Sequence, residues 1–247
     1  MSHAEAIIAL LAVGGRGRRY ASPVTIGDVL REALDLYRSF FGRFVLTAAA
    51  VFVFVDLLSA IAIDARNEST GVAVAWGLVS VVVGFVGAFW VQGTLVATVQ
   101  DVRSGKAKTT IGDVYDRVRP RLPALISAGL LGGLGIALGL VLLVVPGLIL
   151  LTRWALLAPV IVLEGRSAGD SFRRSTELVR GSGWTVFGVI LATLLVAIVA
   201  HSVLVAVFSF LPDFAANWAG GTIADSLVTP FVALSWTVMY FRLSRQT

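Results

Sequence analysis

The chain has 247 residues, of which 57% are hydrophobic and only 14% are charged. Soluble domains carry roughly 25% charged residues, so this composition excludes an ordinary soluble enzyme or binding module. The formal net charge is +5, and the absence of cysteine excludes disulfides, thiolate catalysis and thiolate metal sites.

Residues 1–24 are predicted to be an N-terminal tail. The stretch 6–13 is apolar, but it is short and its arginines follow it, the reverse of a secretory signal peptide. We therefore expect a loosely ordered or interfacial tail, followed by a single membrane domain over residues 25–247.

Long apolar segments occupy most of that domain, and a helix needs about 20 residues at 1.5 Å rise to cross a bilayer. The segment 122–163 is too long for one span, and Pro146-Gly147 is the expected divider because this dipeptide favours a turn. The sequence thus predicts an all-α integral membrane protein with six transmembrane helices in three helical hairpins. The predicted spans are 44–63, 72–99, 122–145, 148–163, 183–211 and 220–241.

One polar pentapeptide recurs along the chain, as TIGDV at 25–29, TIGDV at 110–114 and SAGDS at 167–171. Each copy opens a segment of helical period, which predicts an amphipathic helix at the cytoplasmic headgroup level before each hairpin. A hydroxyl followed three residues later by a carboxylate suits a helix N-terminus. We favour this structural role over a metal or phosphate site built from Gly-Asp pairs. The predicted cap pairs are Thr25 with Asp28, Thr110 with Asp113, and Ser167 with Asp170.

The sequence therefore predicts three copies of one unit, which consists of a short amphipathic helix followed by two spans. The copies cover about 25–100, 110–163 and 167–242, and all three have the same orientation in the membrane. All Lys and Arg residues except Arg66 and Arg153 lie before the first span, between spans two and three, between spans four and five, or after the last span. Short basic loops stay in the cytoplasm, so both termini are predicted to be cytoplasmic in the plasma (inner) membrane. The positive charge indicates attraction to anionic lipid headgroups at the cytoplasmic face and no nucleic-acid binding. Protein partners are not predicted.

Ionisable residues inside spans are the default candidates for a functional site. At 1.5 Å per residue, Asp56, Arg153 and Asp225 lie within about 5 Å of one another in depth, in the outer half of the membrane. We predict that Arg153 pairs with Asp56, and also with Asp225, above His201. A structural ion pair is the favoured interpretation. The alternative is a polar pocket, open to the outer leaflet or periplasmic face, that receives a headgroup or an ion.

The stretch 144–183, VVPGLILLTRWALLAPVIVLEGRSAGDSFRRSTELVRGSG, resembles a segment of a prokaryotic membrane family. The matching features are Pro146-Gly147, Arg153, Ala158-Pro159, Leu163-Glu164-Gly165, Asp170, Arg174-Ser175 and Gly181. The family is named after the membrane domain of some glycerophosphoryl diester phosphodiesterases, and the resemblance extends over roughly 24–243. It implies the six-span plan but no catalytic residues, because those relatives carry their hydrolase as a separate soluble barrel. We expect no such barrel in these 247 residues.

No catalytic motif accompanies the spans: there are two histidines, and no HExxH, GxSxG or Walker sequence. We expect no enzyme, no cofactor and no metal; a hydrolase using Asp56 or Asp225 is disfavoured because nothing orients a nucleophile. The preferred function is a non-enzymatic envelope protein that organises or senses lipids or partner proteins. The alternative is a transporter or lipid-binding protein with a polar intramembrane pocket.

Overall fold

The computed structural model describes residues 24–64, 70–105 and 109–246, so the predicted tail lies outside the described residues except for Val24. Every regular element in these ranges is a helix. The elements are α2 (Ile26–Ser39), α3 (Phe41–Asp64), α4 (Thr70–Arg103), α5 (Ile111–Val118), η2 (Arg119–Arg121), α6 (Leu122–Leu142), α7 (Val144–Arg153), α8 (Leu157–Glu164), α9 (Ala168–Val179), α10 (Gly183–Phe208), α11 (Asp213–Ala215), η3 (Ala216–Gly220) and α12 (Gly221–Leu243).

Six helical segments of the described chain are long and apolar enough to cross a membrane, which confirms the predicted all-α, six-span class. Two of them are composite: the third includes the short helix α5, and the fourth consists of α7 and α8. The segments are Phe41–Ile63, Thr70–Arg103, Ile111–Leu142, Val144–Glu164, Gly183–Phe208 and Trp218–Leu243.

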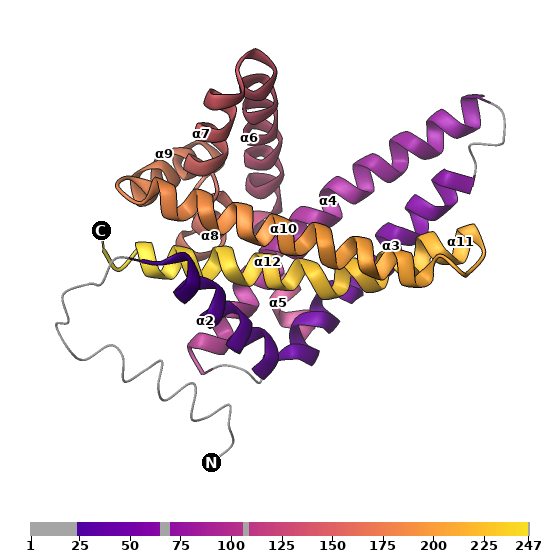
Figure 1. Ribbon diagram of the computed structural model, residues 1–247, viewed down its shortest axis with the longest axis horizontal. Coiled ribbons are helices and arrows are strands. Elements are labelled where there is room, and N and C mark those ends of the chain that lie inside the picture. Colours follow the sequence, from indigo (N-terminus) through magenta and orange to yellow (C-terminus); the bar gives the residue numbers. More distant parts are fainter. Residues whose placement is uncertain (1–23, 65–69, 106–108, 247) are drawn as a thin grey trace.

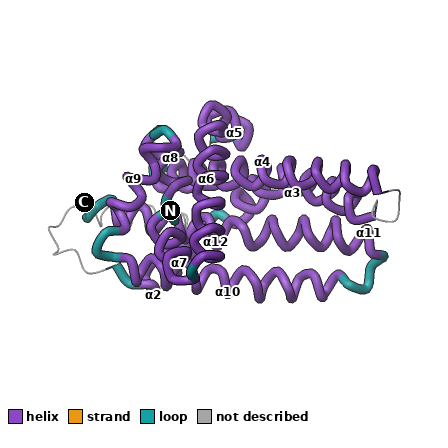
Figure 2. Tube along the Cα trace, turned by 90° about the horizontal axis from the view of Figure 1, so that it is seen from above, coloured by secondary structure: helices purple, strands orange, loops and turns teal. Residues whose placement is uncertain are grey.

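Consecutive spans pack against each other, α3 on α4, α6 on α7 and α10 on α12. The first and third pairs are joined because α12 also packs along α3. In Figure 1 the α6–α7 pair runs upward, whereas α10 and α12 run horizontally. The three pairs therefore diverge from a common base, where α2, α5, α8 and α9 lie. Seen from above, α3, α4, α10 and α12 extend from that base toward the same side (Figure 2).

The turn between the third and fourth spans lies three residues earlier than the sequence predicted. Leu143 is the extended residue (φ −156°, ψ 127°) that separates α6 from α7. Pro146 lies in the first turn of α7, where its missing N–H costs nothing because that group has no intrahelical acceptor. Gly147 contributes through its lack of a side chain, since a Cβ there would meet the Leu140 backbone nitrogen at 2.6 Å. The dipeptide thus fits the two helices together instead of forming the turn.

The three helices that follow the pentapeptides lie against the protein's own spans. Helix α2 packs on α12, α5 on α4, and α9 on α8 and α6. Val29, Ala33 and Leu36 on α2, and Val114 and Val118 on α5, are buried by these contacts. An amphipathic helix at the headgroup level would rest its apolar face on the bilayer, but here the adjacent helices cover these faces and remove the same surface from water. Tyr37 of α2 donates its hydroxyl to the Leu227 carbonyl at 2.8 Å, and burial raises its pKa to about 12.

The buried core lies at the base. The outer parts of the three diverging span pairs, which we call the arms, expose large apolar side chains. Phe44, Leu95, Leu156 and Leu234 are buried at the base. By contrast, Val141 at the end of α6 is 84% exposed. A soluble monomer rarely exposes a continuous apolar surface of this kind, but hydrocarbon chains cover it in a membrane. The divergence therefore fits an integral membrane protein whose arms are surrounded by lipid.

Replacing Gly147 by alanine should destabilise the protein by about 1–3 kcal/mol, because the new methyl overpacks the α6–α7 contact. Thermal unfolding of the purified protein in detergent measures this. The matched control is Gly133→Ala on α6, where no atom lies within 4 Å of an added Cβ. Equal unfolding temperatures for the two variants would contradict the close approach.

Candidate functional site

The six predicted cap residues form three similar N-termini. The side-chain oxygens of Thr25, Thr110 and Ser167 each accept a hydrogen bond from the backbone N–H three residues on, at 3.2 Å. The Asp113 carboxylate also accepts from the Thr110 N–H at 3.2 Å, which completes a capping box. These contacts use the hydroxyls and carboxylates within the helix ends, the structural role favoured from the sequence.

We call the region formed by α2, α5, η2, α9 and the C-terminal turns of α4, α8 and α12 the basic end. Three carboxylates join its helices to the spans, and each forms hydrogen bonds or ion pairs with at least two arginines. Asp101, at the end of α4, has a side chain only 3% exposed. Arg117 of α5 donates to both of its oxygens, at 2.7 and 3.2 Å, and the Arg43 Nη2 lies 3.8 Å away. Asp101 therefore holds α5 against α4.

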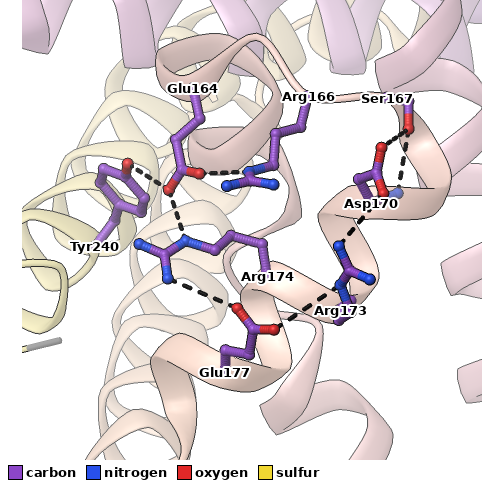
Figure 3. Close-up of polar contacts among 8 residues, drawn as sticks. All are labelled: Glu164, Arg166, Ser167, Asp170, Arg173, Arg174, Glu177 and Tyr240. Atoms are coloured by element: carbon purple, nitrogen blue, oxygen red, sulfur yellow. Dashed lines mark hydrogen bonds and ion pairs between the residues drawn. The ribbon is translucent and has the colours of Figure 1, made fainter.

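Glu164, at the end of α8, is the second of these carboxylates (Figure 3). It accepts from the Arg174 Nε of α9 at 3.1 Å and from the Arg166 Nε at 2.6 Å. The Tyr240 hydroxyl of α12 donates to it at 3.0 Å. Three parts of the chain, α8, α9 and α12, thus meet at one side chain. The Glu164 carboxylate also holds the pKa of Arg166 above its usual range.

Glu32 of α2 is the third carboxylate, and here the acid lies on the short helix. It accepts from the Arg103 Nη1 of α4 at 2.6 Å and from the Arg242 Nε of α12 at 2.9 Å. Arg103 also stacks over the Phe241 ring, 4.6 Å from its centroid. Glu32 therefore connects α2 to the ends of two spans.

Sequence reasoning missed these three carboxylates, although a spacing in the chain indicates them. Glu32, Arg117 and Arg174 each lie seven residues after a cap, at Thr25, Thr110 and Ser167 respectively. Their partners include Asp101 and Glu164, which begin the similar sequences DVRS and EGRS at the ends of α4 and α8. The position seven residues after the cap thus carries a charged residue in all three predicted copies, and its charge is negative in the first and positive in the other two.

Span four is broken between α7 and α8, at residues 154–156, which sequence reasoning did not predict. Ser175 of α9 is fully buried and satisfies both sides of the break. It donates to the Arg153 carbonyl at 2.7 Å and accepts from the Leu156 N–H at 3.2 Å. Irregular backbone is tolerated at membrane depth only where protein supplies such partners. A single hydroxyl of α9 therefore holds span four in its discontinuous form.

The predicted pair of Arg153 with Asp56 and Asp225 is wrong. Arg153 ends α7, which packs on α6, α9 and α10, and this packing places the residue beside α9 and the start of α10, near the basic end. It is exposed and lines a pocket of about 760 Å³ together with Arg180 and Trp184. The depth count along span four did not determine which helices α7 packs against.

The other three intramembrane residues do come together, on α3, α10 and α12. The His201 Nδ1 lies 3.4 Å from the Asp225 Oδ1. Asp56 is 9% exposed and packs against Gly221, and one of its carboxylate oxygens has no hydrogen-bond partner within the described structure. This cluster connects the outer parts of the first and third span pairs without a basic residue from the fourth span.

Comparison with known families gives one match. A family model described as the membrane domain of glycerophosphoryl diester phosphodiesterase matches residues 121–243. The second half of the chain resembles that membrane domain. The match confirms the resemblance predicted from residues 144–183, over a range shorter than the 24–243 expected. It covers α6 to α12, including Glu164, Ser175 and the pocket, and shows no catalytic domain.

Comparisons with curated proteins and with solved structures gave no match.

Replacing Ser175 by alanine should cost about 1–3 kcal/mol, because it leaves a buried carbonyl and a buried N–H unpaired. Ser171→Ala is the matched control: Ser171 is equally buried on α9, but it bonds only the Ala168 carbonyl of its own helix. Thermal unfolding in detergent should place Ser175→Ala well below Ser171→Ala. Indistinguishable midpoints would argue against the proposed clamp.

Replacing Asp101 by asparagine should destabilise the protein by about 1–3 kcal/mol. Removing one partner of a buried ion pair typically costs about 3–5 kcal/mol, and the partial exposure of Arg117 reduces that figure. Asp170→Asn, at an exposed carboxylate on α9, should change stability much less. Denaturant titration followed by tryptophan fluorescence compares the two, and a neutral Asp101→Asn would show that Asp101 does not hold α5 in place.

Proposed function

We propose that this chain is a non-enzymatic membrane protein that organises anionic lipids around its basic end. The observation that carries the proposal is the division of the described arginines into a paired and an unpaired group. The paired group is held by Glu32, Asp101 and Glu164, apart from Arg173, which pairs with Asp170 and Glu177 of its own helix. The other has no ion pair with any described residue and comprises Arg31, Arg38, Arg119, Arg121, Arg153, Arg180 and Arg245.

The unpaired arginines surround the places where spans meet short helices. Each basic residue near an anionic membrane surface contributes about 1 kcal/mol of attraction. The paired group fixes α2, α5 and α9 against the spans, so the unpaired cations are presented at fixed positions. A rigid basic surface of this kind supports binding of phosphate-bearing headgroups, and protein partners with acidic segments are a second class it can accept.

The non-enzymatic part of the proposal is supported by the chemistry of the two polar regions. At the basic end, the carboxylates of Glu32, Asp101 and Glu164 are occupied by arginines, so none is available as a general base. In the spans, the imidazole of His201 faces Asp225, with no serine or threonine nucleophile in hydrogen bond with it among the described residues. Neither region contains a nucleophile oriented by a base.

A lipid-binding or lipid-transporting protein is the second candidate, and the break in span four favours it. Discontinuous helices commonly form substrate sites in membrane transporters. Here the break adjoins the pocket of Arg153 and Arg180. The sequence placed the polar pocket near the outer leaflet, whereas this pocket adjoins the basic end.

We further propose that the basic end faces the cytoplasm in the plasma membrane. Because the chain has no cysteine, single cysteines can report accessibility. Glu177→Cys at the basic end should resist a membrane-impermeant maleimide in intact cells and react after lysis. Ser209→Cys, at the far end of α10, should react in intact cells. The opposite pattern would reverse the proposed orientation.

The lipid proposal predicts that the purified protein retains anionic lipid in preference to zwitterionic lipid. In nanodiscs with equal amounts of phosphatidylglycerol and phosphatidylcholine, the lipid extracted with the protein should be enriched in phosphatidylglycerol. Neutralising Arg31, Arg38 and Arg119 together should reduce that enrichment, and raised salt should do the same because it screens exposed charges. Equal retention of both lipids at low salt would contradict the proposal.

A further inference from the structure

The pocket beside the break in span four combines an apolar wall with unpaired cations. Its volume is about 760 Å³, within the range of small-molecule sites. Val145, Leu148 and Ile149 of α7 form one wall, and Trp184 and Phe187 of α10 form another. Arg153 and Arg180 lie where these walls reach the basic end.

Both arginines are exposed and have no ion pair with a described residue. Their situation differs from that of Arg103, Arg117 and Arg174, which are all held by carboxylates. Arg153 ends α7 and Arg180 follows α9. Two unpaired guanidinium groups at one pocket are complementary to a phosphate, because arginine can bind phosphate oxygens bidentately.

The backbone at the pocket adds to the positive potential. Gly181, at φ 84°, reverses the chain between α9 and α10, a conformation that L side chains rarely adopt. Helix α10 then begins at Gly183, and no side chain caps its first turn. Gly183 and Trp184 belong to that turn and line the pocket, so the positive end of a 26-residue helix faces the same space as the two arginines.

The apolar wall indicates what accompanies the phosphate. Val145 is 66% exposed, Ile149 46% and Trp184 87%, and all lie on surfaces that face outward from the protein. Thr152 and Thr176 also line the pocket, but each donates its hydroxyl to a carbonyl of its own helix at 2.8 Å. The polar recognition therefore comes from the cations, and the rest of the pocket accommodates hydrocarbon.

We infer that this pocket binds one anionic phospholipid, with the phosphate at Arg153 and Arg180 and an acyl chain along α7. The inference rests on the proposed function and assigns its most selective site. It also gives Arg153 a role other than the ion pair predicted from the sequence. The packing of α7 on α9 and α10 places Arg153 in this pocket instead of in an ion pair with Asp56 or Asp225.

Native mass spectrometry of the full-length protein tests the inference. Released from nanodiscs with equal phosphatidylglycerol and phosphatidylcholine of the same acyl chains, the protein should retain one phosphatidylglycerol at least about tenfold more than phosphatidylcholine, as two cationic contacts imply. Arg153→Ala with Arg180→Ala should abolish that preference. Because neither arginine has an ion-pair partner, the variant should keep its unfolding temperature.

The control is Arg31→Ala with Arg38→Ala, which removes two exposed, unpaired arginines of α2. This variant should keep the single bound phosphatidylglycerol while losing general anionic-lipid enrichment. Arg153→Lys with Arg180→Lys, which preserves the charge, should retain part of the preference and guards against a misfolded alanine variant. Glycerol phosphate, the headgroup without chains, should not displace the lipid at equal concentration.

The outcomes separate the two proposals. The variant Arg153→Ala with Arg180→Ala could retain one phosphatidylglycerol, while Arg31→Ala with Arg38→Ala loses it. That result would reject the pocket as the binding site and would still support the proposed lipid function. No preference in the unaltered protein would overturn both. Displacement by glycerol phosphate at equal concentration would assign the pocket to a soluble phosphate and reject the lipid.

Discussion

The structure depends on how its charged residues are satisfied at the place where apolar spans converge. Moving an unpaired charge out of water is costly, so the ends of α4, α8 and α12 need partners that the spans cannot supply. Glu32, Arg117 and Arg174 on the short helices supply them, seven residues after each cap. The short helices therefore close the polar base of the bundle, and the arms above it are free to diverge into lipid.

The span count and the capped helix starts followed from the sequence because they depend on local patterns. Runs of apolar residues set the spans, and a hydroxyl with an acid three residues later sets the caps. The position of Arg153 did not follow. It depends on the packing of α7 against α9 and α10, two helices that come later in the chain. A depth count along one helix cannot include a contact of that kind.

Several residues of the stretch 144–183, which resembles the membrane family, have packing or hydrogen-bonding roles in the structure. Gly147 fits two helices together, Glu164 receives Arg174, and Ser175 bridges the break. Gly165 ends α8 in the left-handed conformation at φ 67°. These are packing and hydrogen-bonding roles, which explains why no catalytic assignment could be carried over from residues 144–183. Arg153 is the exception, since its side chain has no partner within the described chain.

The charge of Glu32 on α2, opposite to that of Arg117 on α5 and Arg174 on α9, affects which short helix can pack against which span. Seven residues after their caps, helices α5 and α9 carry Arg117 and Arg174. Helix α2 carries Glu32 at the same position, and this carboxylate contacts the arginines of α4 and α12. If α2 approached the end of α8 in place of α9, two carboxylates would face each other and repel. Like charges placed together disfavour wrong partners. The negative charge of Glu32 thus disfavours the packing of α2 at the position that α9 occupies.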